Sequence, residues 1–324
     1  MGGRINFPSQ IALLALLIVA LFLVINYSSF ASDHIQYTPD IPTASDAHLT
    51  STGSGHGGGL KEVQIAKHLH FLYNIGDHEQ KVYSQNGEDG VLQYLFANMG
   101  TKDKYYVEFG VWDGSECNTR FLWEHNGWDG LLMDGSAKAF DTRVIHNHFI
   151  NESNIVSLFQ KYNVPIKFDL LSVDLDSSDY WVSRAIFMGG YRPRVFIIEM
   201  NRNFDVDEAF TVSRTKLLWT EPAALFGVSP LGAAYLCNKF GYTLVYLDKQ
   251  VVNGFCISRA ALVDMIYAKT GFTVTEEEIS HYLPPWSYVY RRVAPIAVDS
   301  LVKFKTEVQS LSEWKRIGEN GEID

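Results

Sequence analysis

The sequence predicts an α/β fold built on a doubly wound, mostly parallel sheet. Strand-like segments alternate with helical segments about every 25 residues, which is the pattern of an open sheet with helices on both faces. The strand-like segments are nearly continuous apolar runs, as burial on both faces of a sheet requires. Four of these runs end on an acidic residue, and this third feature bears on function.

The strands are predicted where short apolar runs are followed by turn residues. These runs are 104–110, 130–135, 146–150, 168–175, 194–201, 242–248 and 253–258. The last two are expected to pair as an antiparallel edge of the sheet.

Helices are predicted where apolar residues recur at helical spacing. These segments are 86–100, 154–162, 179–190 and 229–241. In the last of them Ser229 is the predicted N-cap, Pro230 lies in the first turn and Gly241 ends the helix. Asp179 is the predicted cap of the helix that begins "YWVSRAIF".

The composition fits one large globular domain with appendages, because 47% of the 324 residues are apolar. The formal net charge is −10 and no basic patch stands out, so nucleic acid is not expected as a partner. The cysteines Cys117, Cys237 and Cys256 have no metal-ligand spacing. One disulfide, between Cys237 and Cys256, is an option, but three buried free thiols are the expected state.

The N-terminal region contains the unbroken apolar run "IALLALLIVALFLVI". Extended to Phe30, it has the length of one membrane span. Positive charge lies only before the run, at Arg4, until Lys61, so the positive-inside rule places the N-terminus in the cytosol. We therefore predict a cytosolic tail at 1–10 and a transmembrane signal anchor at 11–30. A cleaved signal peptide is the alternative.

This arrangement predicts a single-pass type II membrane protein of the endoplasmic reticulum or Golgi, with its folded domain in the lumen. The Gly-rich and polar segment 31–75 is expected to be a flexible stem. The main domain is predicted at 76–262. The segment 263–324 is a C-terminal extension to which the sequence assigns no role.

The strand-ending acids are the first candidates for a functional site. Ligands of doubly wound sheets bind beyond the carboxyl ends of the strands. The acids at these ends are Glu108, Asp134, Asp174 and Glu199. Four such acids on one edge suggest a ligand that carries hydroxyl groups or positive charge.

The segment "VEFGVWDG" narrows the choice of ligand. A strand runs into Glu108, Gly110 and Gly114, which is not the glycine pattern that places a pyrophosphate on a helix. A cofactor without phosphates fits better, and S-adenosylmethionine is the obvious one. Asp134 lies where a carboxylate would accept hydrogen bonds from the ribose hydroxyls of this cofactor. The alternative for this segment is an ordinary strand–helix turn.

A set of motifs occurs in an order that resembles the FkbM-type methyltransferase-like family. The motifs, within 83–259, are "YSQNGEDGVLQYLF", "YYVEFGVWDGSECNTRFL", "GWDGLLMDGS", "NIVSLFQKYNVPIKFDLLSVDLDSSDYW", "YRPRVFIIEMN" and "NGFCISR". The resemblance implies a Rossmann-like class I methyltransferase fold with an S-adenosylmethionine site. It implies that the pocket is lined by Glu108, Gly110, Asp113, Gly114, Asn118 and Asp134, and closed from the preceding helix by Ser84, Gln85, Glu88 and Asp89.

Asp174 and Glu199 are the predicted catalytic residues, because they end the strands beside the expected methyl group. Asp174 would orient an acceptor hydroxyl or take its proton. Tyr180 and Trp181 are expected to pack in the core. No metal ligand is assigned in this interpretation. The alternative is that Asp174 and Asp176 form the metal-binding Asp-x-Asp of a glycosyltransferase.

The predicted function is therefore an S-adenosylmethionine-dependent O-methyltransferase of the secretory lumen, with a glycan or a small molecule as acceptor. The chain is also similar to Star-type membrane proteins, which carry this domain behind a single anchor. For them the resemblance implies a secretory-pathway role that does not require catalysis. A non-catalytic lumenal domain that binds a client protein is thus the second hypothesis.

Overall fold

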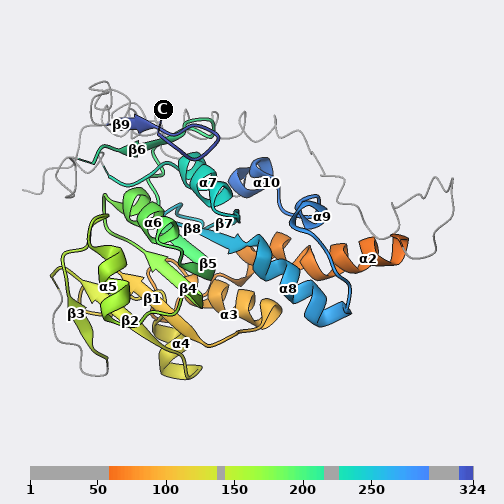
Figure 1. Ribbon diagram of the computed structural model, residues 1–324, viewed down its shortest axis with the longest axis horizontal. Helices are drawn as coiled ribbons and strands as arrows, with labels where there is room; N and C mark the ends of the chain where they lie inside the picture. The colour runs from red at the N-terminus through yellow and green to blue at the C-terminus, as the bar shows by residue number, and fades with distance from the viewer. Residues whose placement is uncertain (1–57, 137–142, 215–225, 292–313, 324) are drawn as a thin grey trace, which may run out of the picture. The chain divides into compact units, whose positions relative to one another are not determined.

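A computed structural model describes residues 58–136, 143–214, 226–291 and 314–323. These residues form a mixed α/β domain around a seven-stranded, mostly parallel sheet (Figure 1). The strand order is β3-β2-β1-β4-β5-β8-β7. None of the helices within the described ranges has the length and apolar character needed to cross a membrane. The predicted anchor at 11–30 lies outside those ranges.

The sheet confirms the predicted mostly parallel arrangement. β1 to β5 run parallel to one another, and β8 runs antiparallel to both β5 and β7. The antiparallel pairing of β7 with β8 was predicted for the last two strands. The strands are β1 Tyr105–Phe109, β2 Asp129–Asp134, β3 Ile145–Asn147, β4 Lys167–Val173, β5 Arg192–Glu199, β7 Tyr242–Leu247 and β8 Asn253–Ser258.

Helices cover both faces of this sheet (Figure 1). One face carries α5 Ile155–Lys161, α6 Asp179–Met188 and α7 Pro230–Lys239. The other face carries α2 Gly58–Leu69, α3 Glu88–Met99, α4 Arg120–His125 and α8 Arg259–Thr270.

Alternate residues of each central strand pack on opposite faces. In β1, Val107 and Phe109 belong to the core under α5 and α6, whereas Tyr106 belongs to the core under α3. This burial on both faces explains the continuous apolar runs in the sequence.

The folded part begins earlier than the predicted boundary at 76. Residues 58–75, which the sequence assigns to the stem, form α2, the short 3-10 helix η1 His70–Tyr73 and the start of a second one, η2 Ile75–His78. Ile65 and Leu69 of α2 are buried against the sheet's core. The glycines that precede α2 obscured this helix in the sequence.

The C-terminal extension also packs onto the domain. α9 Glu276–Ser280 and α10 Trp286–Arg291 follow α8, and β9 Trp314–Arg316 pairs antiparallel with β6 Phe210–Val212. The strand β6 follows β5, so this small sheet lies on the segment that leaves the end of β5.

Local details confirm some predictions and correct others. Ser229 caps α7 by accepting a hydrogen bond from Gly232, as predicted. The prediction that Asp179 caps α6 is wrong: Ser178 holds the cap position, and Asp179 is the first helical residue. Cys237 and Cys256 form a disulfide between α7 and β8, so the expected state of three free thiols is also wrong. Cys117 is free and buried.

Candidate functional site

The predicted acids do gather at one edge of the sheet. β1, β2, β4 and β5 are parallel, so their carboxyl ends lie on the same side. The strand register places one residue from each neighbouring strand in a row along this edge, here called the rim row: Asp134, Gly110, Asp174, Glu199 and Asn253. Glu108 lies two residues before Gly110 on β1.

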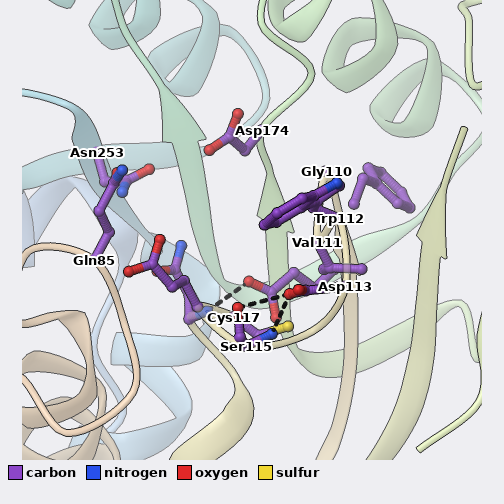
Figure 2. Close-up of a pocket in the computed structure, with 13 residues that line it drawn as sticks. Gln85, Gly110, Val111, Trp112, Asp113, Ser115, Cys117, Asp174 and Asn253 are labelled. Atoms are coloured by element: carbon purple, nitrogen blue, oxygen red, sulfur yellow. Dashed lines mark hydrogen bonds between the residues drawn. The ribbon is translucent and has the colours of Figure 1, made fainter. Parts of the chain in front are cut away.

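A cavity of about 130 Å³ opens beside the rim row. Figure 2 shows Gln85 and Asn253 on one side of this cavity, and Asp174 and the turn after β1 around the rest. Six of the nine predicted site residues line it: Gln85, Glu108, Gly110, Asp113, Asn118 and Asp174.

The other three predicted site residues are not part of the cavity lining. Gly114 shapes the turn after β1, where its N–H donates to the carbonyl of Val111 at a positive φ of 82°. Asp134 and Glu199 belong to the rim row, but their carboxylates are engaged by neighbouring residues.

Gly110 is required by a close approach between two strand ends. A Cβ atom at this position would lie 1.7 Å from the carbonyl oxygen of Asp174, and φ is +70°. No other residue type fits such a contact. The glycine therefore brings the ends of β1 and β4 together, in addition to lining the cavity.

Glu108 holds the loop that follows the turn. Its carboxylate accepts hydrogen bonds from the N–H groups of Asn118 and Thr119 and from the Thr119 hydroxyl. Burial raises the pKa of Glu108 to about 7, although these hydrogen bonds oppose the shift. In this structure Glu108 fixes the shape of one wall of the cavity.

Asp134 is similarly engaged. One carboxylate oxygen accepts from the N–H of Trp112 at 2.8 Å, and the other accepts from the N–H and hydroxyl of Ser136. These bonds tie the end of β2 to the turn after β1. They leave Asp134 8% exposed.

The polar residues at the start of α3 mostly form hydrogen bonds within their own segment. Asp89 accepts from the hydroxyl and N–H of Ser84 and from two further N–H groups, so it ties the segment before α3 to the first turn of the helix. Glu88 accepts from Asn86 and from the side-chain amide of Asn253. Of the four residues predicted to close the pocket from this side, only Gln85 lines it.

A cluster of carboxylates lies at the ends of β4 and β5. Oxygens of Asp174, Asp176 and Glu199 lie within 4.8 Å of one another. Burial and then the charge of Asp176 raise the pKa of Asp174 to about 7. Burial and then the charge of Asp174 raise the pKa values of Glu199 and the adjacent Asp179 well above their usual range. Acidic groups thus face one another here.

The sequence did not identify several residues that line the cavity. They come from the end of β1, from the turn after it and from β8: Phe109, Val111, Trp112, Ser115, Glu116, Cys117 and Asn253. Asn253 could have been found, because the start of an antiparallel last strand meets the carboxyl ends of its neighbours. Trp112 has a positive φ of 45° and a half-exposed side chain, which no sequence pattern indicates.

Tyr180 and Trp181 pack in the core, as predicted, and do not reach the cavity. The Tyr180 hydroxyl donates to the carbonyl of Gly321, and the Trp181 indole donates to that of Val212. Both contacts join α6 to the small β6–β9 region.

The charge of the cavity restricts its ligands. Among the described residues that line it, four are acidic and none is lysine or arginine; the acids are Glu108, Asp113, Glu116 and Asp174. A positively charged or hydroxyl-rich ligand suits such a lining better than a diphosphate.

No protein-family model matches this chain, and no curated protein matches it significantly.

Proposed function

We propose that this chain is an S-adenosylmethionine-dependent O-methyltransferase with a Rossmann-like class I methyltransferase fold. The observation that carries the proposal is the position and charge of the cavity. It opens at the carboxyl ends of β1 and β4, where doubly wound sheets bind their ligands, and its lining is acidic. S-adenosylmethionine has a positive sulfonium and an ammonium group, ribose hydroxyls and no phosphate.

Each predicted cofactor residue has a role in this proposal. Gly110 and Gly114 shape the turn against which the amino-acid end of the cofactor lies, and Glu108 and Asn118 hold the wall behind it. Asp113 and Gln85 present polar groups from two sides of the cavity. The ribose hydroxyls would reach Asp134 beside the same turn. The resemblance to the FkbM-type family supports this assignment through the same residues.

The proposed reaction transfers the methyl group to a hydroxyl of a glycan. The acceptor oxygen forms a bond to the methyl carbon as the carbon–sulfur bond breaks, and the sulfur keeps the electron pair and becomes a neutral thioether. The hydroxyl proton passes to the carboxylate of Asp174, and Glu199 next to it helps to orient the acceptor. Alignment of the two reacting atoms supplies most of the rate.

Two features support a location in the secretory lumen behind an N-terminal anchor. The apolar run at 11–25 follows the only positive charge of the N-terminal 60 residues, Arg4. The disulfide between Cys237 and Cys256 is typical of proteins that fold in an oxidising compartment.

A specific observation also favours the second candidate, a non-catalytic lumenal domain of the Star type that binds a client protein. The cavity of about 130 Å³ is small beside the roughly 300–1,000 Å³ of most ligand sites. Glu108 and Asp134 are also already hydrogen-bonded within the chain. The enzyme therefore requires the turn after β1 to open when the cofactor binds.

Titration calorimetry with S-adenosylmethionine separates the two candidates. The full-length chain in detergent micelles should bind the cofactor with a Kd in the micromolar range. Gln85→Ala should weaken binding about tenfold by removing an exposed cavity residue, which is about 1.4 kcal/mol. Gln160→Ala, on the exposed side of α5, makes the same change away from the cavity and should leave the Kd unaltered.

Absence of binding at millimolar cofactor would reject the enzyme and favour the client-binding domain. Equal weakening by both variants would show that the cofactor binds elsewhere.

A further inference from the structure

The ends of β4 and β5 carry four carboxylates that the fold leaves largely without hydrogen-bond donors. They belong to Asp174, Asp176, Asp179 and Glu199. The donors that do reach these carboxylates are backbone groups: the N–H of Asp176 donates to Glu199 at 3.1 Å, and that of Leu175 donates to Asp179 at 2.8 Å. No lysine, arginine or histidine of the described ranges forms an ion pair with any of the four.

Asp179 supplies independent evidence for a ligand at this group of carboxylates. Its side chain is fully buried, and its Oδ2 atom has no hydrogen-bond partner. Its Oδ1 atom accepts from the N–H of Leu175, which lies between Asp174 and Asp176 in the sequence. An unpartnered buried oxygen is costly and rare in folded proteins.

Asn253, on β8, supplies a second buried oxygen without a hydrogen-bond partner. Its side chain is 3% exposed and lines the same cavity as Asp174 (Figure 2). Its amide nitrogen donates to Glu88, but its Oδ1 atom has no partner. Asn253 is also the register partner of Glu199 across β5 and β8. Two buried oxygens beside the cluster, Asp179 Oδ2 and Asn253 Oδ1, thus lack a partner, and such oxygens call for a donor or a cation. The hydroxyl of Ser177 is also buried without a partner.

We propose that Asp174, Asp176 and Glu199 bind a divalent cation of the oxygen-preferring class, namely Mg²⁺, Mn²⁺ or Ca²⁺. One oxygen from each residue lies within 4.8 Å of the others, which is a spacing that a shared cation can bridge. Asn253 offers a neutral oxygen from β8, and the buried charge of Asp179 adds to the attraction. The three ligands are all carboxylates, which disfavours zinc, since zinc sites usually include histidine or cysteine.

The electrostatics of the cluster agree with this assignment. The three carboxylates that lie within 4.8 Å of one another concentrate negative charge at one place, which attracts a cation. The site goes beyond the proposed methyl transfer and does not depend on it, because cation binding needs no cofactor. It is also compatible with that reaction: each residue offers one carboxylate oxygen to the cation, which leaves the second oxygen of Asp174 for the acceptor proton.

Thermal unfolding of the full-length chain in detergent micelles tests the site. The chain is first stripped with EDTA, and MgCl₂, MnCl₂ or CaCl₂ is then added at 1 mM with the ionic strength held constant by NaCl. At least one cation should raise the Tm by about 5 °C, as expected for a ligand well above its Kd. No cofactor is present in this experiment.

Asp176→Asn is the informative variant, because Asp176 is exposed and Asn tolerates its positive φ of 59°. The variant should fold with a Tm no lower than that of the stripped wild type, and the cation-dependent rise should be lost. Asp264→Asn, on the exposed side of α8, removes the same charge and should keep the full rise. The proposal is overturned if no cation raises the wild-type Tm, or if Asp176→Asn shows an equal rise.

Discussion

At this edge of the sheet, the acids on the two sides of Gly110 differ in their hydrogen-bond partners. On the β1–β2 side, Glu108 and Asp134 accept hydrogen bonds from nearby N–H and hydroxyl groups. On the β4–β5 side, Asp174, Asp176 and Glu199 face one another with few donors. An acid at a strand end therefore does not by itself mark a ligand site. Its hydrogen-bond partners decide whether it stabilises the fold or is available to bind a ligand.

Gly110 joins the two sides, so its substitution should have the largest effect. In Gly110→Ala the new methyl group would meet the carbonyl oxygen of Asp174, which cannot move without separating β1 from β4. We expect a loss of at least about 4 kcal/mol in the free energy of unfolding, measured by urea denaturation.

Gly271→Ala is the matched control for this substitution. Gly271 also has a positive φ, +74°, but no atom lies within 4 Å of the position of its Cβ. Its cost should be only about 1–2 kcal/mol, the cost of the left-handed conformation. Equal losses in the two variants would show that the approach of β1 to β4 is unimportant.

Glu108→Gln should weaken the pH dependence of the free energy of unfolding, because it removes a buried carboxyl group with a raised pKa. The folded-state pKa of about 7 lies above the usual value of 4.5, so the folded state binds more protons than the unfolded state between these pH values. The wild type should therefore lose stability as the pH rises from about 4.5 to 7. The contribution of Glu108 to this loss of unfolding free energy is on the order of 3 kcal/mol.

The slope of unfolding free energy against pH, from urea denaturation at pH 5 to 8, measures this share. It should be shallower in Glu108→Gln than in the wild type. Glu116→Gln makes the same change at an exposed position and should follow the wild-type slope. A slope in Glu108→Gln as steep as that of the wild type would show that Glu108 is not the source.

Much of the fold followed from the sequence, because buried strands and their following turns leave local signals. The runs that end at Glu108, Asp134, Asp174 and Glu199 all became neighbouring strands with the predicted direction. The helix at 58–69 was missed because its buried face depends on only a few residues, such as Ile65 and Leu69, that pack on distant parts of the chain.

The candidate site was less predictable, because hydrogen-bond partners are set by tertiary contacts. Residue type placed Asp134 and Asp174 in one class, yet Asp134 meets the N–H of Trp112 while Asp174 meets other acids. The contribution of Asn253 depends on the pairing of β5 with β8, and the pairing of Cys237 with Cys256 depends on the packing of α7. None of these contacts leaves a local pattern.

The most direct test of this contrast is one Asp→Asn substitution made on each side of Gly110, with the free energy of unfolding measured in EDTA. Asp134→Asn should destabilise the chain by about 2 kcal/mol, because the N–H of Trp112 would then face an amide NH₂ group. Asp176→Asn should stabilise it by about 0.5 kcal/mol, because it removes a charge from a crowded cluster. Opposite signs support the account, whereas equal losses in both variants would contradict it.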